Sequence, residues 1–162
     1  NGRCDVIVEL EPWEYEHASH VGIGRVTANW GVQDAAHYEK SRMQDDRTAS
    51  VAGAICELAV AKHTNQFWSG SVWPRSAHDT YKHLPDVGAN IEVRRVRTGK
   101  KVAVRERDTG RGLELWAARA VEPEFRSVDV LGYLPYDTAW EWADSSSFDG
   151  TRYLPIVHLV CP

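Results

Sequence analysis

The stretch from residue 91 to residue 131 constrains the fold most, because it holds four short apolar segments separated by Gly- or Pro-containing turns. Residues 91–97 and 101–106 alternate apolar with charged side chains, which is typical of strands with one buried face. Residues 113–121 are apolar at most positions and predict a central strand, and residues 127–131 predict a fourth. Short turns join antiparallel neighbours, so the stretch predicts an antiparallel meander.

The apolar residues between positions 48 and 67 recur every three or four residues, which predicts an amphipathic helix. Thr48 or Ser50 can cap the start of this helix. Asn65 is a reasonable signal for its C-terminal end. This is the strongest helical pattern in the chain.

Weaker patterns surround this helix. Residues 12–29 have helical spacing that is interrupted by two glycines, and residues 135–143 predict a helical turn led by a proline. Residues 5–10 predict a short strand or the lead-in to a helix, and residues 33–47 predict a mixture of helical turn and loop.

The chain length of 162 residues suits one domain, with 43% hydrophobic and 26% charged residues. We therefore expect residues 1–162 to form a single α+β domain with α/β/α sandwich-like layers. Its mixed sheet would contain the antiparallel meander and be flanked by helices. A Rossmann series is excluded at this stage, because the strands follow one another through turns and not through crossover helices.

The segment that carries candidate chemistry is LPDVGANIEVRR, which places two acidic residues near the start of a predicted strand. Asp86 precedes a turn, and Glu92 follows six positions later. On a strand Glu92 and Arg94 share one face, while Ile91 and Val93 point into the core. Two carboxylates held close together repel unless a cation lies between them, and such oxygen ligands suit Mg²⁺ or Mn²⁺.

Glu57 extends this pattern from the predicted helix. Its neighbours one turn away are small or apolar: Gly53, Ala54, Val60 and Ala61. A carboxylate on such a stripe is costly to bury without a partner. A metal ion, a buried arginine or a backbone amide would each offset that cost.

The segments GAICELAVAKH, PDVGANIEVRRV and VLGYLPYDTAW resemble the PD-(D/E)XK nuclease superfamily, and more narrowly its small phage-encoded proteins. The resemblance covers roughly residues 50 to 140. In that family a helical Glu precedes an Asp and then an (Asp/Glu)-x-Lys triplet. The resemblance implies a restriction-endonuclease-like core, with Glu57, Asp86 and Glu92 as ligands of Mg²⁺ or Mn²⁺.

The implied activity is metal-dependent hydrolysis of DNA phosphodiester bonds, with these three acids and Arg94 as catalytic residues. Arg94 stands where the family has lysine, and arginine effectively cannot lose its proton. Arg94 can still hold the attacking water or stabilise charge on the phosphorane. Alternatively, Lys62 supplies an ammonium group from the helix.

A basic run supports contact with DNA, since seven Lys or Arg residues fall within positions 94–107. The residues expected to position the DNA backbone are Arg95, Arg97, Lys100 and Lys101. The net charge of −4, with His neutral, excludes a protein that coats DNA through charge alone. Asp108 is either an outer-shell acid or part of an ordinary Asp-Thr-Gly turn.

Cellular context follows from weaker signals. Three cysteines at positions 4, 56 and 161 argue against a disulfide framework and a Cys-based zinc site, and they fit a reducing compartment. No apolar run reaches about 18 residues and the first residues lack an apolar signal core, so we expect no membrane span. The expected location is cytoplasmic, in the host cytoplasm if phage-encoded. The expected partners are DNA and, as in many such nucleases, a second copy of the chain.

Other functions have less support. His17 and His20 have the spacing of a zinc-ligand pair, but no matching His or Cys pair accompanies them. The chain lacks a Gly-x-Ser-x-Gly elbow and a Gly-x-x-x-x-Gly-Lys-(Ser/Thr) loop. Two alternatives stay open: an inactive nuclease-fold protein that binds nucleic acid or a host defence protein, and a structural or virion component whose seven Trp residues serve an interface.

Overall fold

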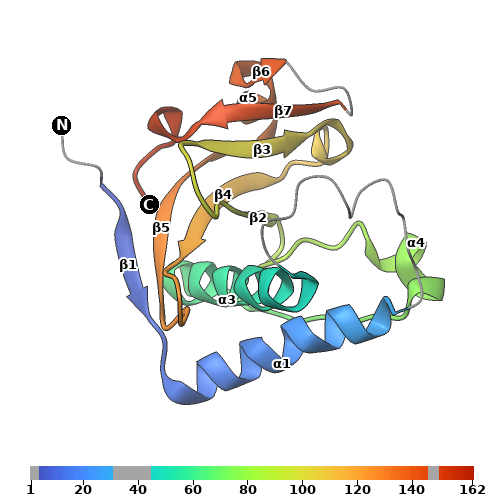
Figure 1. Cartoon of the computed structure of the whole chain (residues 1–162). Coiled ribbons are helices and arrows are strands. Elements are labelled where there is room, and N and C mark those ends of the chain that lie inside the picture. Colours follow the sequence, from blue (N-terminus) through green and yellow to red (C-terminus); the bar gives the residue numbers. More distant parts are fainter. Residues whose placement is uncertain (1–3, 31–44, 146–149) are drawn as a thin grey trace.

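The computed structural model describes residues 4–30, 45–145 and 150–162 (Figure 1). The loop and helical turn expected over residues 33–47 therefore lie outside the described residues, except for the last three positions. The elements are β1 (Val6–Glu9), α1 (Pro12–Ala28), α3 (Asp46–Thr64), η1 (Arg75–Ala77), α4 (His78–Tyr81), β2 (Ile91–Arg95), β3 (Lys101–Arg105), η2 (Glu106–Asp108), β4 (Glu114–Ala120), β5 (Ser127–Pro135), α5 (Tyr136–Trp142), β6 (Asp144–Ser145), β7 (Thr151–Pro155) and η3 (Ile156–His158).

The described residues form an α+β fold, which confirms the predicted class, but they contain two sheets where one mixed sheet was expected. A mixed four-stranded sheet has the order β1-β5-β4-β2, in which β2 is parallel to β4 and the other pairs are antiparallel. An antiparallel three-stranded sheet has the order β3-β7-β6. Helices α1 and α3 lie along one side of the larger sheet, and the smaller sheet with α5 lies on the other side (Figure 1).

Strand β4 separates two hydrophobic cores. Trp116 and Ala118 belong to the core between the larger sheet and the helices α1 and α3. Leu115 and Ala117 belong to the core shared with β3, β7 and α5. Because alternate side chains point to opposite faces, a strand buried on both faces must be apolar at nearly every position. This confirms the prediction of a central strand over residues 113–121.

The meander predicted across residues 91–106 is wrong. β2 pairs with β4, whereas β3 pairs with β7 in the other sheet. The Arg119 guanidinium donates hydrogen bonds to the carbonyls of Val96 (3.1 Å) and Gly99 (2.7 Å), so the chain stays beside β4 up to the turn. It then crosses to the second core, where Val102 and Val104 are buried. The α/β/α layering is consequently right for only one face, since a sheet with one helix covers the other.

Helix α3 ends at the residue that the sequence predicts, but a different residue caps its start. The side chain of Asp45 caps α3 by accepting a hydrogen bond from the Thr48 backbone N–H at 2.8 Å, so neither Thr48 nor Ser50 is the cap. Asn65 ends α3 in the left-handed conformation, with φ of 53°, which confirms the C-terminal signal. Within the described parts of the chain, no helix combines the length and apolar character needed to cross a membrane.

Residues 12–29 form helix α1 despite their two glycines, and the packing of α1 on α3 requires one of them, Gly22. A Cβ at Gly22 would lie 2.5 Å from the Val51 Cα atom on α3, which is closer than atoms can approach. The Ser50 hydroxyl donates a hydrogen bond of 2.8 Å to the Gly22 carbonyl at the same crossing. Glycine has a low helix propensity, but its lack of a Cβ permits the close packing of α1 on α3 at this position.

We predict that Gly22→Ala and Gly53→Ala change stability in opposite directions. The first forces the α1–α3 backbones apart and should lower the free energy of unfolding by about 2 kcal/mol or more. Nothing lies within 4 Å of a Cβ at Gly53, so alanine there should raise stability by up to about 1 kcal/mol. Urea unfolding followed by circular dichroism measures both. Equal effects of the two variants would contradict the packing role of Gly22.

The cysteines are paired differently from the expectation. Cys4 forms a disulfide with Cys161, and Cys56 is free and buried on α3. The two partners lie 157 positions apart, so no local spacing signals the bond. The expectation of unpaired cysteines is wrong, and the bond weighs against a reducing compartment.

We predict that the double variant Cys4→Ala, Cys161→Ala lowers the free energy of unfolding by about 2–5 kcal/mol, because the unfolded chain gains the freedom that the cross-link removes. Chemical denaturation with and without dithiothreitol measures the effect. The reductant should destabilise the wild type and leave the double variant unchanged. A reductant effect of equal size in both proteins would contradict the role of this bond.

Candidate active site

Strand β2 brings the predicted triplet to the edge of the larger sheet. Ile91 and Val93 are buried in the core next to α3. Glu92 and Arg94 lie on the opposite face, with side chains only 15% and 18% exposed. The prediction that Glu92 and Arg94 share one face is therefore confirmed.

Asp86 lies in the reversal that leads into β2. Val87 and Ile91 exchange two backbone hydrogen bonds of 3.1 Å, which closes this reversal. The Asp86 carboxylate accepts a hydrogen bond of 2.8 Å from the Val93 N–H. Asp86 therefore reaches β2 from the preceding turn of the same segment, on the edge of the strand that has no sheet neighbour.

The carboxyl groups of this segment are desolvated and repel one another. Burial raises the pKa of Asp86 well above its ordinary value, and the charges of Glu57 and Glu92 raise it further. Burial also raises the pKa of Glu92 to about 7, against the lowering effect of the Arg94 charge. Because each group affects the pKa of another, the three predicted ligands lie within electrostatic reach.

Glu57 has its charge neutralised from α1. Its carboxylate accepts two hydrogen bonds from the Arg25 guanidinium, at 2.5 Å and 3.1 Å, and a third from the Trp68 indole N–H at 3.3 Å. Arg25 is held in turn by the Ser71 carbonyl at 3.1 Å. Of the three partners considered for Glu57, the structure contains an arginine, which is half-buried.

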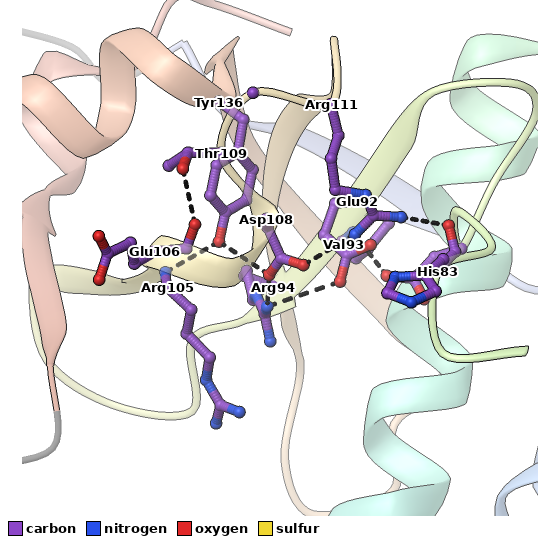
Figure 2. Close-up of polar contacts among 12 residues, drawn as sticks. His83, Glu92, Val93, Arg94, Arg105, Glu106, Asp108, Thr109, Arg111 and Tyr136 are labelled. Carbon is purple, nitrogen blue, oxygen red and sulfur yellow. Dashed lines mark hydrogen bonds and ion pairs between the residues drawn. The ribbon is translucent and has the colours of Figure 1, made fainter. Parts of the chain in front are cut away.

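Arg94 is the centre of a second network, on the other face of β2 (Figure 2). Its guanidinium lies 2.6 Å from an Asp108 carboxylate oxygen and 3.5 Å from Glu92. Asp108 also pairs with Arg111 at 3.1 Å and accepts a hydrogen bond of 3.3 Å from the Tyr136 hydroxyl. Asp108 is thus a buried acid that holds Arg94, and not only a turn residue.

The three acids do not form one ligand set. Among the residues described, no group of three or more His, Cys, Asp and Glu side chains is arranged to hold a metal ion. Glu57 approaches β2 from the α3 side, whereas Glu92 projects from the opposite face, and Asp86 interacts electrostatically with both. Asp86 therefore lies between the other two acids and interacts with each of them, while Glu57 and Glu92 project from opposite sides of β2.

Lys62 is not brought to these acids. Its ammonium group binds the Glu14 carboxylate at 2.7 Å and the Glu9 carbonyl at 2.9 Å, near the start of α1. Five positions along an α-helix correspond to a rotation of about 140°, so Lys62 points away from the direction of Glu57. The helical spacing alone argues against the ammonium donor considered above.

Two of the four residues expected to position DNA face one acidic side chain. Arg97 lies 3.0 Å from the Glu122 carboxylate, and Arg95 lies 3.8 Å from it. Glu122 belongs to the connection between β4 and β5, away from Asp86. These two arginines are therefore partly neutralised within the protein.

The other two lie on the smaller sheet and its entry. Lys101 pairs with Asp144 at 2.9 Å, and Lys100 is exposed in the turn before β3. The basic run is contiguous in sequence, but its members are distributed over several parts of the surface. It does not form one continuous track beside the acids.

The partners that complete both networks come from distant segments. Arg25, Trp68, Arg111 and Tyr136 carried no local signal of a site, because each is recognised only by what it contacts. The one available signal was the cost of burying Glu57, which indicates a partner for the carboxylate but does not distinguish a metal ion, an arginine and a backbone amide. Asp108 was the only one of these partners considered from sequence.

Comparison with protein-family models, curated proteins and solved structures finds no match to this chain. The resemblance to PD-(D/E)XK nucleases therefore stays a prediction that stands on the residues themselves.

We predict that Glu92→Gln stabilises the protein at high pH. The pKa of Glu92 is raised on folding from 4.5 to about 7, so the folded state binds its proton more tightly and stability falls as pH rises across this window. The variant should exceed the wild type by on the order of 2 kcal/mol at pH 8, and the difference should shrink towards pH 4.5.

Urea unfolding with EDTA at several pH values measures this difference. Glu124→Gln is the control, because that acid is exposed and, among the residues described, pairs with Arg126 alone. A Glu92→Gln variant that is less stable than the wild type at pH 8 would contradict the prediction that ionised Glu92 destabilises the folded state.

Proposed function

We propose that this protein is a metal-dependent nuclease that hydrolyses DNA phosphodiester bonds, built on a restriction-endonuclease-like core of the PD-(D/E)XK type. The observation that carries the proposal is the pair of desolvated carboxyl groups at β2: Asp86 lies against the free edge of the strand, and Glu92 projects from the face that also carries Arg94. Their desolvation and mutual repulsion make ionisation costly. A divalent cation between them would offset that cost.

Among the described residues the three acids are not arranged as one ligand set, but Asp86, Glu92 and Glu57 offer only carboxylate oxygens, the donors that suit Mg²⁺ or Mn²⁺. Asp86 and Glu92 would hold the ion. Both Glu57 oxygens already accept hydrogen bonds from Arg25, so Glu57 would act through water or after that pair opens. When bound, the ion supplies Lewis-acid polarisation of a phosphoryl oxygen and a lowered pKa for water.

Arg94 serves a different purpose from the lysine that it replaces. Asp108 holds the guanidinium at 2.6 Å, so its position is set before a substrate arrives. It keeps its positive charge at any ordinary pH, and it would orient the scissile phosphate and offset negative charge that develops there. Proton removal from water would fall to another group.

A second candidate function is a protein on the same core that binds nucleic acid or a host defence protein without cleavage. The closed Arg25–Glu57 pair favours it, because both oxygens of a predicted metal ligand are already taken by the guanidinium. The partner is DNA in the first proposal, and nucleic acid or a host defence protein in the second. A homodimer rests on the resemblance. A cytoplasmic location rests on the cysteine pattern and the lack of a signal core, and the disulfide weighs against it.

We predict that Asp86→Asn and Glu92→Gln each lower cleavage of plasmid or single-stranded DNA by 100-fold or more in Mg²⁺ or Mn²⁺, because each removes a charged ligand oxygen. Circular dichroism checks that both variants remain folded. Glu124→Gln, an exposed acid, is the matched control and should cleave like the wild type.

Three outcomes decide between the candidates. Wild-type cleavage by both Asp86→Asn and Glu92→Gln removes these acids from the mechanism. DNA binding without cleavage in either metal favours the second candidate. Activity gained in Arg94→Lys would then show that the substitution at this position had silenced the site.

A further inference from the structure

A pocket of about 300 Å³ opens beside the Arg94 network. Its walls come from the segment before α4, from α4 and the residues after it, and from η2 with the following turn. The volume lies at the lower end of small-molecule sites, so it suits one nucleotide and excludes a duplex.

The pocket carries a local excess of positive charge in a chain of net charge −4. Lys82, Arg107 and Arg111 line it together with two histidines, and Asp108 is the one acid among its lining residues. The Asp108 charge is already balanced by Arg94 and Arg111. The unbalanced charge in the pocket is therefore cationic and suits a phosphate group.

Arg107 is the residue best placed to receive that phosphate. It is exposed, and within the described part of the chain it has neither a hydrogen bond nor an ion pair. Lys82 pairs with the exposed Asp79 at 3.0 Å, an interaction that water screens and a phosphate can displace.

An aromatic wall completes the pocket. Trp73 lines it and stacks on Tyr81, with ring centroids 5.8 Å apart and an interplanar angle of 27°. This contact holds the indole in place, so it offers a preset flat surface. Nucleic-acid bases stack on such surfaces only when they are free of a duplex stack.

The pocket adjoins the carboxyl groups of β2. Arg111 lines the pocket, binds Asp108, and donates a hydrogen bond to the His83 carbonyl (Figure 2). Asp108 in turn binds Arg94, which lies 3.5 Å from Glu92. Asp108, a wall of the pocket, therefore links it directly to Arg94 and, through Arg94, to Glu92.

We propose that this pocket binds one nucleotide of a single-stranded DNA, with its base on Trp73 and its phosphate on Arg107 and Lys82. As a substrate subsite this inference rests on the proposed nuclease function, and it adds the preference for single strands. The phosphate is either a terminal monophosphate or an internal phosphodiester, which share the same recognition chemistry.

The test is binding in EDTA, where cleavage cannot occur, measured by fluorescence anisotropy with a 3′-labelled oligothymidylate and the full-length protein. Arg107→Gln and Trp73→Ala should each weaken binding 10-fold or more. Arg107→Gln should also lower the slope of log Kd against log salt by about one. The control Arg126→Gln removes an exposed arginine that pairs with Glu124, and its affinity should stay within 2-fold.

Further arms make the result decisive. A blunt duplex of equal length should bind at least 10-fold more weakly than the single strand. Tighter binding of the 5′-phosphorylated strand assigns a terminal phosphate, and equal binding assigns an internal one. If Trp73→Ala fails to fold, Trp73→Leu, which retains apolar bulk without an aromatic face, takes its place and should weaken binding to the same degree.

The inference is overturned if the wild type does not bind the single strand, if the duplex binds equally well, or if Arg107→Gln binds like the wild type. Asp86→Asn should bind the single strand normally in EDTA, because Asp86 does not line the pocket. Intact binding with no cleavage in metal would thus reject the nuclease proposal alone, and cleavage with no effect of Arg107→Gln would reject the pocket alone.

Discussion

Removing carboxylates from water costs free energy, and the central side-chain contacts of this molecule are those that offset this cost. Glu57 is stabilised by a bidentate contact with Arg25, and Asp108 by Arg94 and Arg111. The carboxylates are 6–9% exposed and their arginines 18–27%, so these pairs are screened by water less than the pairs at the surface, which contribute about 0–1 kcal/mol. These two networks therefore tie α1 to α3 and β2 to η2 far more firmly than the pairs at the surface.

Asp86 and Glu92 are the acids whose cost is not fully offset. Asp86 accepts one backbone hydrogen bond and lies between the charges of Glu57 and Glu92. Glu92 has Arg94 nearby, yet burial still raises its pKa to about 7. Two desolvated carboxyl groups with raised pKa values lower the stability of the fold at neutral pH. Groups with such perturbed pKa values cluster at functional sites.

The position of β2 connects packing to the proposed chemistry. One face of the strand packs into the helical core, which holds Ile91 and Val93, and its other face carries Glu92 and Arg94. The strand has a neighbour on one side only, so the reversal containing Asp86 can fold against its free edge. The same geometry separates Glu57 from Glu92 and explains why the acids meet through Asp86.

The sequence by itself determined the features that depend on neighbours close in the chain. Helical periodicity placed α3 and its end at Asn65, continuous apolarity identified β4 as central, and alternation put Glu92 and Arg94 on one face. Only the tertiary structure decided which strands pair, which arginine reaches Glu57, that Cys4 joins Cys161, and that a basic, aromatic pocket adjoins Arg94. The physical reason is separation along the chain. Turns and periodicity record local preferences, whereas strand partners, buried ion pairs and disulfides are chosen by how distant segments pack.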